Sequence, residues 1–428
     1  MIRSASPVGR LALALVTLLG CSRQDPLPGT VPELKDYAAK ARDEAQAART
    51  GKDPGKAEAA WKRADRAATA ARELGEGKPE ADAALLAEIT RTADDARVIT
   101  ELAREDAELA ARISGLKAKT YRHARNLALG GVLEGLAIAA RHAAKDPGAL
   151  LSPGIGEAAD LGELISSLFS PPRPRLGTAP DWNGIAQDLE GLAATPPAAW
   201  SAFLAVAFAL LGSPDLALVE VQEVDAEAFA LLDTEVDPES RQTGAMLLRG
   251  FVYTLAGLPR LGAAELESLA EVSDAGKGKS QELLAGAHLL LAYVFSRLRE
   301  WKLADRELAL TLRVWPNNPA GVFLTGERLV ASGEYEKAAE SLELAFQGSD
   351  SEALARRAAE RARAIRDGRT KDPALFLDNA FLAEVALHVV AESAKKSAAG
   401  RKVRDWVEAA RGFGSRILAS VSGDHAGK

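Results

Sequence analysis

Apolar residues recur along much of the chain at the spacing of an α-helix. In and just after residues 80–114, a run of 35 residues without glycine or proline, five of them follow one another at intervals of three, seven, four and three: Ile99, Leu102, Leu109, Ile113 and Leu116. This spacing places them on one helical stripe. The pattern predicts a long antiparallel hairpin or bundle arm. A self-associating coiled coil is the alternative, although Asp106 interrupts its heptads.

Composition supports helices throughout. The chain has 428 residues, of which 47% are hydrophobic, 26% are charged and only 5% are aromatic. Abundant alanine and leucine with few β-branched runs argue against a sandwich or barrel. The length suffices for two or three cores. Glycine and proline at residues 51–55 and 75–79 separate helices expected near 33–50 and 55–74.

Residues 1–20 are typical of an export signal. Arg3 and Arg10 precede a nine-residue apolar core at 11–19, which is far shorter than the roughly 20 residues that span a bilayer. The run Leu18-Leu19-Gly20-Cys21 resembles the lipobox of bacterial lipoproteins, and Cys21 is the single cysteine of the chain. The resemblance implies that the mature protein begins at Cys21, which carries a diacylglycerol and an N-acyl chain such as palmitate, and that the proline-containing stretch 21–33 is a tether.

The segment 287–316 and the segment 321–345 superpose at an offset of 34 residues. Under this shift Ala292 aligns with Gly326, and Trp301 aligns with Tyr335. The period and the small and aromatic positions resemble the tetratricopeptide repeat, in which two antiparallel helices form each unit. Weaker copies lie at 200–221 and 246–266, and a degenerate copy is possible at 38–71. The resemblance predicts close packing at Ala205, Ala217, Gly250, Gly262, Ala292, Trp301, Ala304, Gly326, Tyr335 and Ala338.

These observations predict an all-α fold in which a helical hairpin or bundle region precedes a superhelical solenoid of helix pairs. The expected order is the signal at 1–20, the tether at 21–33 and a helical region at 34–150. A Pro/Gly-rich linker at 151–197, the repeats at 198–350 and capping helices at 351–428 follow. Within the last region, residues 374–391 and 403–421 read as amphipathic helices that close the end of the solenoid.

The first helices of such repeats line a concave surface that generally binds peptides or protein segments. Transferred to this chain, the groove positions are Phe203, Val206, Leu247, Phe251, Leu289, Leu290, Tyr293, Arg297, Phe323, Leu324 and Glu327. Because this surface is mostly apolar, we expect it to be covered. The occupant is either the chain's own N-terminal or linker helices or an apolar partner segment.

Charge separates the repeats from the end of the chain. Residues 151–350 hold 14 basic and 29 acidic side chains, a net charge of −15, and residues 351–428 hold 15 and 10, a net charge of +5. The acidic region disfavours nucleic acid as a partner. Six arginines between 356 and 369 are expected to form a solvated helix face that complements the repeats. A membrane-binding or polyanion-binding role is the alternative.

The sequence offers no chemistry for catalysis. Five scattered histidines and one cysteine lack metal-ligand spacing, and no nucleophile motif occurs. We therefore expect no enzyme and no cofactor apart from the lipid on Cys21. The expected function is a membrane-anchored, non-catalytic interaction or assembly adaptor of the bacterial envelope that faces the periplasm, with the outer membrane favoured by Ser22. The alternative is a ligand-binding component of an envelope transport system whose apolar groove holds a small hydrophobic molecule.

Overall fold

The computed structural model describes residues 26–75, 81–169, 180–194, 199–210, 212–225, 238–274, 281–349 and 351–369, together with 377–379, 381, 382, 385, 386 and 389. All secondary structure among these residues is helical. The chain divides into two compact units, Met1–Ala107 and Glu108–Lys428. The boundary therefore falls inside the predicted helical region 34–150. The predicted export signal and Cys21 lie outside the described residues.

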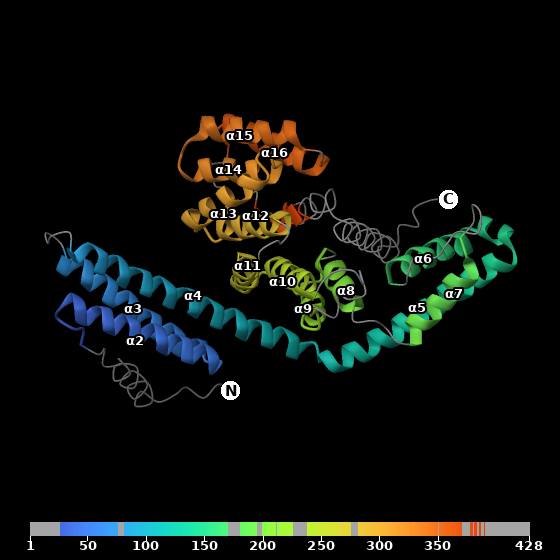
Figure 1. Cartoon of the computed structure of the whole chain (residues 1–428), viewed down its shortest axis with the longest axis horizontal. Helices are drawn as coiled ribbons and strands as arrows, with labels where there is room; N and C mark the ends of the chain where they lie inside the picture. The colour runs from blue at the N-terminus through green and yellow to red at the C-terminus, as the bar shows by residue number, and fades with distance from the viewer. Residues whose placement is uncertain are drawn as a thin grey trace, which may run out of the picture. The chain divides into compact units, whose positions relative to one another are not determined.

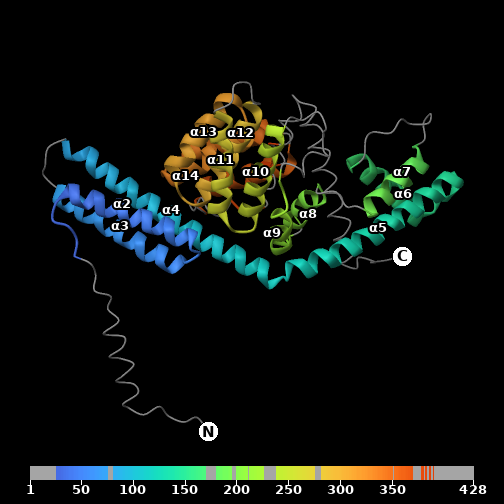
Figure 2. The same ribbon diagram turned by 60° about the horizontal axis from the view of Figure 1, so that its bottom comes forward.

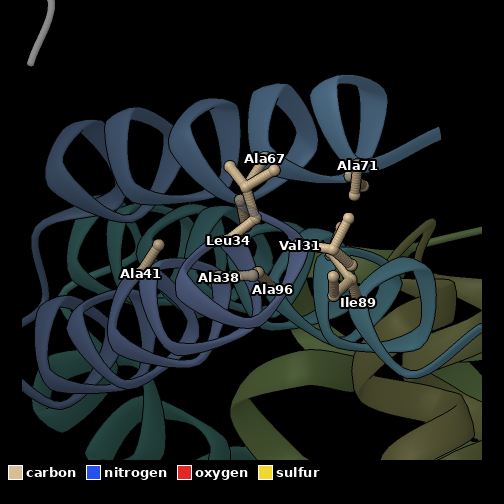
Figure 3. Close-up of a cluster of buried hydrophobic side chains, with 11 residues drawn as sticks. Val31, Leu34, Ala38, Ala41, Ala67, Ala71, Ile89 and Ala96 are labelled. Atoms are coloured by element: carbon tan, nitrogen blue, oxygen red, sulfur yellow. The ribbon is translucent and has the colours of Figure 1, made fainter. Parts of the chain in front are cut away.

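The first unit contains helices α2 (Val31–Thr50) and α3 (Pro54–Gly75) and most of α4 (Ala81–Gly115). Helix α2 starts inside the stretch predicted as a tether, and its first residue, Val31, is buried. Small apolar residues recur every three or four positions on α2 and α3, so the two helices can pack closely. Figure 3 shows Leu34, Ala38, Ala67 and Ala96 in the space between the helices.

Polar contacts join α4 to the other two helices of this unit. The Thr100 hydroxyl donates a hydrogen bond to the Ala57 carbonyl over 3.0 Å, inside the packed interface. Arg49 of α2 pairs with Asp106 at 2.9 Å, at the edge of the same interface. Leu102 is buried within this unit, which is the arrangement of a bundle arm. The first part of the apolar stripe in residues 80–114 thus packs against other helices of the same unit.

The second unit begins with a small helical bundle. Helix α5 (Ala118–Lys145) packs against α6 (Pro153–Phe169) and α7 (Trp182–Ala194), and a 3-10 helix, η1 (Pro147–Leu151), connects α5 to α6. Both views show α6 and α7 along the later part of α5 (Figures 1 and 2). The segment 151–197 expected as a linker therefore contains two packed helices. Its apolar residues Ile185 and Leu189 are buried, which explains why it is not an open connection.

Antiparallel helix pairs follow, in agreement with the predicted all-α fold of packed helix pairs. They are α8 (Ala199–Leu210) with α9 (Pro214–Val221), α10 (Pro238–Leu255) with α11 (Pro259–Asp274), α12 (Gln281–Arg297) with α13 (Trp301–Val314), and α14 (Pro319–Ala331) with α15 (Tyr335–Gly348). Helix α16 (Glu352–Arg366) packs on both α14 and α15. Figure 1 shows α12 and α13 next to each other, with α14 and α15 above them. We call helices α8 to α16 the helix stack.

The first helices of successive pairs lie side by side. Contacts run from α8 to α10, from α10 to α12, from α12 to α14 and from α14 to α16. A residue with positive φ lies two positions after the end of the first helix of each pair: Gly212, Gly257, Arg299 and Gly333. Each of these precedes the start of the second helix by two positions, at Pro214, Pro259, Trp301 and Tyr335. The repeated turn places the row α8, α10, α12, α14 and α16 on one side of the stack.

Candidate binding groove

Small residues lie where the helices of a pair cross. A Cβ atom added to Gly250 would stand 2.7 Å from Leu266 Cγ, and one added to Gly262 would stand 2.8 Å from the Gly250 carbonyl oxygen. In the later pair, a Cβ on Gly326 would stand 2.8 Å from Leu342 Cγ. These distances are too short for a larger side chain. The helix axes can therefore approach as they do only because the crossing residues are small.

The remaining predicted packing positions differ in burial. The alanines are completely inaccessible: Ala205, Ala217, Ala292, Ala304 and Ala338. The aromatic residues Trp301 and Tyr335, each the first residue of a second helix, are only half-buried. They lie beside the turn between the two helices of a pair, where the interior meets solvent.

The predicted groove positions on the first helices are not open to solvent. Buried among them are Phe203, Val206, Phe251, Leu289, Leu290, Tyr293, Phe323, Leu324 and Glu327. Leu247 and Arg297 are half-buried. Part of this burial comes from neighbouring helices of the stack, and part comes from a later segment of the same chain. We call the described residues of 377–389 the groove segment.

The groove segment starts with a turn at residues 377–379, and groups from more than one helix form hydrogen bonds with it. The Tyr293 hydroxyl lies 2.9 Å from the Asp378 carbonyl oxygen and 3.1 Å from that of Leu377, to which it can donate. Arg297 donates to the Asn379 side-chain oxygen over 2.8 Å, and the amide of Asn379 donates to the Leu255 carbonyl over 3.0 Å. Groups from α10 and α12 thus fix the position of this turn.

Helical structure begins directly after the turn. The Asp378 side chain accepts a hydrogen bond from the Phe381 backbone N–H over 2.8 Å, and the Leu382 N–H donates to the Asp378 carbonyl over 3.1 Å. An acceptor side chain at this position is the usual cap of a helix N-terminus. Arg357 of α16 pairs with the same carboxylate at 3.1 Å. The cap of the groove segment is therefore also its charged contact with the stack.

An aromatic residue anchors the segment in the row of first helices. Phe381 is fully buried, with its ring centroid 4.5 Å from that of Phe323 on α14 and 5.8 Å from that of Tyr293 on α12. Further along, Val389 packs on Gly286, where an added Cβ would stand 2.4 Å from Val389 Cγ1. Since Tyr293 contacts the start of the segment and Gly286 contacts its later part, the segment runs antiparallel to α12.

Three expectations from the sequence need correction here. If the chain covered its own groove, its N-terminal or linker helices were the predicted cover, whereas the described cover comes from residues 377–389. Residues 374–391 were expected to close the end of the solenoid, whereas their described part covers the row of first helices, because Phe381 fits between Tyr293 and Phe323. Glu327 is predicted to line the groove, but its carboxylate accepts two hydrogen bonds from Arg361 of α16, at 2.6 and 3.1 Å, and both side chains have no exposed surface. Arg361 is thus not part of a solvated face.

A second charged cluster joins the small bundle to the first helix pair, and nothing in the sequence pattern pointed to it. Glu220 of α9 is fully buried, accepts a hydrogen bond from the Tyr121 hydroxyl over 2.7 Å and pairs with Arg125. Burial raises the pKa of Glu220, although both of these partners act in the opposite direction. Arg112 also reaches this region, with a hydrogen bond of 2.7 Å to the Ala256 carbonyl. These contacts fasten α5 and the end of α4 to the stack.

By length and composition alone, one helical stretch in the described residues could cross a membrane. It is Thr120–Lys145, in α5, and 33% of its most apolar window is buried. The core helix of a small bundle passes the same test, and α5 packs against α6 and α7. Among the described residues, no group of three or more histidine, cysteine, aspartate or glutamate side chains is arranged to hold a metal ion.

Comparison with known proteins gives no relative. The sequence matches no protein-family model, no curated protein and no solved structure.

Proposed function

We propose that this chain is a non-catalytic interaction subunit with tetratricopeptide-like repeats, anchored to a bacterial envelope membrane through a lipid on Cys21. The observation that carries the proposal is the row of first helices α10, α12 and α14, which already holds a helical segment of the chain through the Leu255 carbonyl and the Tyr293 and Phe323 rings. A surface that binds one helix through buried apolar residues and a polar rim has the properties of a helix-binding groove. No cofactor is needed for this activity.

The charge distribution supports a protein partner. Residues 151–350 together have a net charge of −15, which repels the phosphates of nucleic acid and the headgroups of anionic lipids. Apolar anchors such as Phe323 and Tyr293 are instead suited to a protein segment. We place the protein on the periplasmic side of the envelope, with the outer membrane favoured.

Membrane attachment is tested by fractionation without detergent. We expect the wild-type chain in the membrane fraction and the Cys21→Ser variant in the soluble fraction, because the substitution removes the thiol that would carry the lipid. Cys21 is the only cysteine, so Ser22→Ala is a suitable neighbouring control that keeps the thiol. A wild-type chain found entirely in the soluble fraction would contradict the anchor.

The adaptor role is tested by the size of the native particle. We expect wild-type protein, solubilised from membranes in mild detergent, to migrate on native gels within an assembly larger than a single chain and its micelle. A second sample is extracted with organic solvent and analysed by mass spectrometry. A monomer that carries a stoichiometric lipid-like molecule would contradict the adaptor and favour a ligand-binding role instead.

A further inference from the structure

The groove segment occupies a site that a second helix of the same chemistry would fit. Its buried residues are Leu377, Phe381, Leu382, Val385 and Val389, which recur at helical spacing on one face. Asp378 and Asn379, at its start, are exposed. The segment is thus an amphipathic helix that enters the groove with its aromatic residue in the first turn.

Two polar contacts of the segment do not depend on its sequence, because Tyr293 binds the backbone carbonyls of residues 377 and 378. Three others use its side chains: the Asp378 carboxylate pairs with Arg357, and the Asn379 amide contacts Arg297 and the Leu255 carbonyl. A helix that starts with Asp-Asn offers the same groups. The apolar anchors therefore determine which helices fit, and the polar rim sets where the helix starts.

The position of the anchors defines the partner further. Phe381 and Val389 are eight residues apart, about 12 Å along a helix, and their contacts Tyr293 and Gly286 are seven residues apart, about 10 Å along α12. At the far end the groove accepts Val389 only because Gly286 has no side chain. A fitting helix therefore has an aromatic residue near its cap and an aliphatic residue two turns later.

We infer that the groove is a receptor for an amphipathic partner helix with an Asp-Asn-type cap and a first-turn aromatic residue, and that the groove segment blocks it until the partner displaces it. The inference rests on the proposed function, and it names the partner class and the regulation. A short helix has little stability without tertiary contacts, so the segment can leave the groove as one unit. The groove segment competes well with a partner because it belongs to the same chain, which gives it an effective concentration at the groove on the order of millimolar.

The test uses a labelled peptide of residues 374–391 as the partner helix and the full-length chain as the receptor. We expect Phe381→Ala in the chain to raise the affinity for this peptide at least about 10-fold, because the competing segment loses its anchor. Phe346→Ala is the matched control, since Phe346 on α15 is 47% exposed and should leave the affinity unchanged. A peptide that itself carries Phe381→Ala should bind no receptor.

A substitution on the groove side locates the binding. Gly286→Val, added to the Phe381→Ala chain, places methyl groups where Val389 of the peptide must lie, and we expect it to reverse the gain in affinity. Tyr293 gives a spectroscopic signal for the empty groove. Burial raises its pKa to about 12, and release of the segment should return it toward about 10, as seen in the absorbance of tyrosinate.

Several results would overturn the inference. Absence of peptide binding in a Phe381→Ala chain that keeps its helical circular dichroism would mean that the groove takes no helix in trans. A second variant, Asp378→Ala with Asn379→Ala, removes only the exposed cap of the segment. The test then does not depend on Phe381→Ala, which changes a buried residue. Loss of helical signal in both variants would make the segment a permanent part of the core. Dimerisation of the wild type by exchange of this segment would assign the groove to a second copy.

Failure of this inference can be separated from failure of the proposed function. If the peptide does not bind but the wild type forms large envelope assemblies, the adaptor proposal stands and the groove is not its interface. If the peptide binds but the protein is monomeric in the envelope, the groove is a receptor and the adaptor proposal fails.

Discussion

Residues 26–107 and the helix stack are both built from antiparallel helices, but they bury different side chains. In the first unit, eight of the eleven residues in the main core cluster are alanine. Thr100 is the sole buried polar residue described there. The stack instead buries Phe323, Tyr293 and several leucines, together with charged groups such as Glu327 and Arg361. Alanine allows close helices but removes little apolar area from water, whereas large side chains bury more and leave shaped gaps between helices.

The difference bears on what each region can bind. In the first unit, a described recess lies at the α2–α3 turn, where small alanines are rimmed by charged side chains such as Glu44, Lys56 and Arg63 and no large apolar anchor is present. In the stack, the crossings are narrow at Gly250 and Gly326, but the row of first helices presents aromatic side chains that Phe381 fits between. Buried charges in the stack also restrict which helices may meet, because a carboxylate without its guanidinium is strongly unfavourable.

The largest expected effect comes from breaking the buried ion pair of the stack. Arg361→Met leaves the inaccessible Glu327 carboxylate without the guanidinium that now donates two hydrogen bonds to it. We expect the free energy of unfolding of α14 to α16 to fall by about 3–5 kcal/mol. Native-state amide exchange, which follows each helix separately, measures this change.

A matched arginine on the same helix gives the control for that loss. Arg366 pairs with Glu343, but both side chains are substantially exposed, so Arg366→Met should cost less than about 1 kcal/mol. A double variant with Glu327→Leu and Arg361→Met should recover most of the loss, since neither charge remains buried. If Arg361→Met and Arg366→Met lowered the free energy of unfolding equally, the buried ion pair would contribute no more to the stack than an exposed one.

The alanine core of the first unit should be most sensitive to added volume. Ala38 is fully buried on α2, where Figure 3 shows it beside Ala96 of α4, so Ala38→Leu forces the helices apart. We expect a loss of about 1–3 kcal/mol, measured by amide exchange in α2 and α3. Ala47→Leu, at an exposed position of the same helix, should change stability by less than about 0.5 kcal/mol. A tolerated Ala38→Leu would mean that this core is loosely packed.

The helix pairs of the stack could be predicted from the sequence because their packing follows a local rule. Small residues 34 positions apart, such as Ala292 and Gly326, indicate the period and the crossing points of the last two pairs. The alanine periodicity of α2 and α3 indicates helices for the same reason. The packed helices of residues 151–197 are harder to predict, because the prolines and glycines of this segment suggest a linker. The burial of Ile185 and Leu189 also depends on α5, which is distant in sequence.

The covering of the groove could not be predicted in detail. The apolar spacing of residues 377–389 indicates an amphipathic helix, but a helical stripe does not state which surface it meets. Arg361 lies within an arginine-rich run whose members look alike in sequence, and its burial depends on Glu327 arriving from 34 residues away. Glu220 with Tyr121 and Arg125 is a similar case, since the partners are about 100 residues apart.

The smallest expected effect compares the turns of the stack with an ordinary helix position. Gly333 has a φ of +82°, and no atom lies within 4 Å of the position of an added Cβ, so Gly333→Ala introduces backbone strain without a clash. We expect a loss of about 1 kcal/mol, seen as a lower urea midpoint for the stack. The same methyl group placed inside α7, by Gly191→Ala, also meets no atom and should instead stabilise by about 0.5–1 kcal/mol. Changes of opposite sign in the free energy of unfolding, for the same added methyl group, would show that the repeated turn depends on its backbone conformation. A stabilising Gly333→Ala would mean that the turn relaxes and does not set the spacing of the helix pairs.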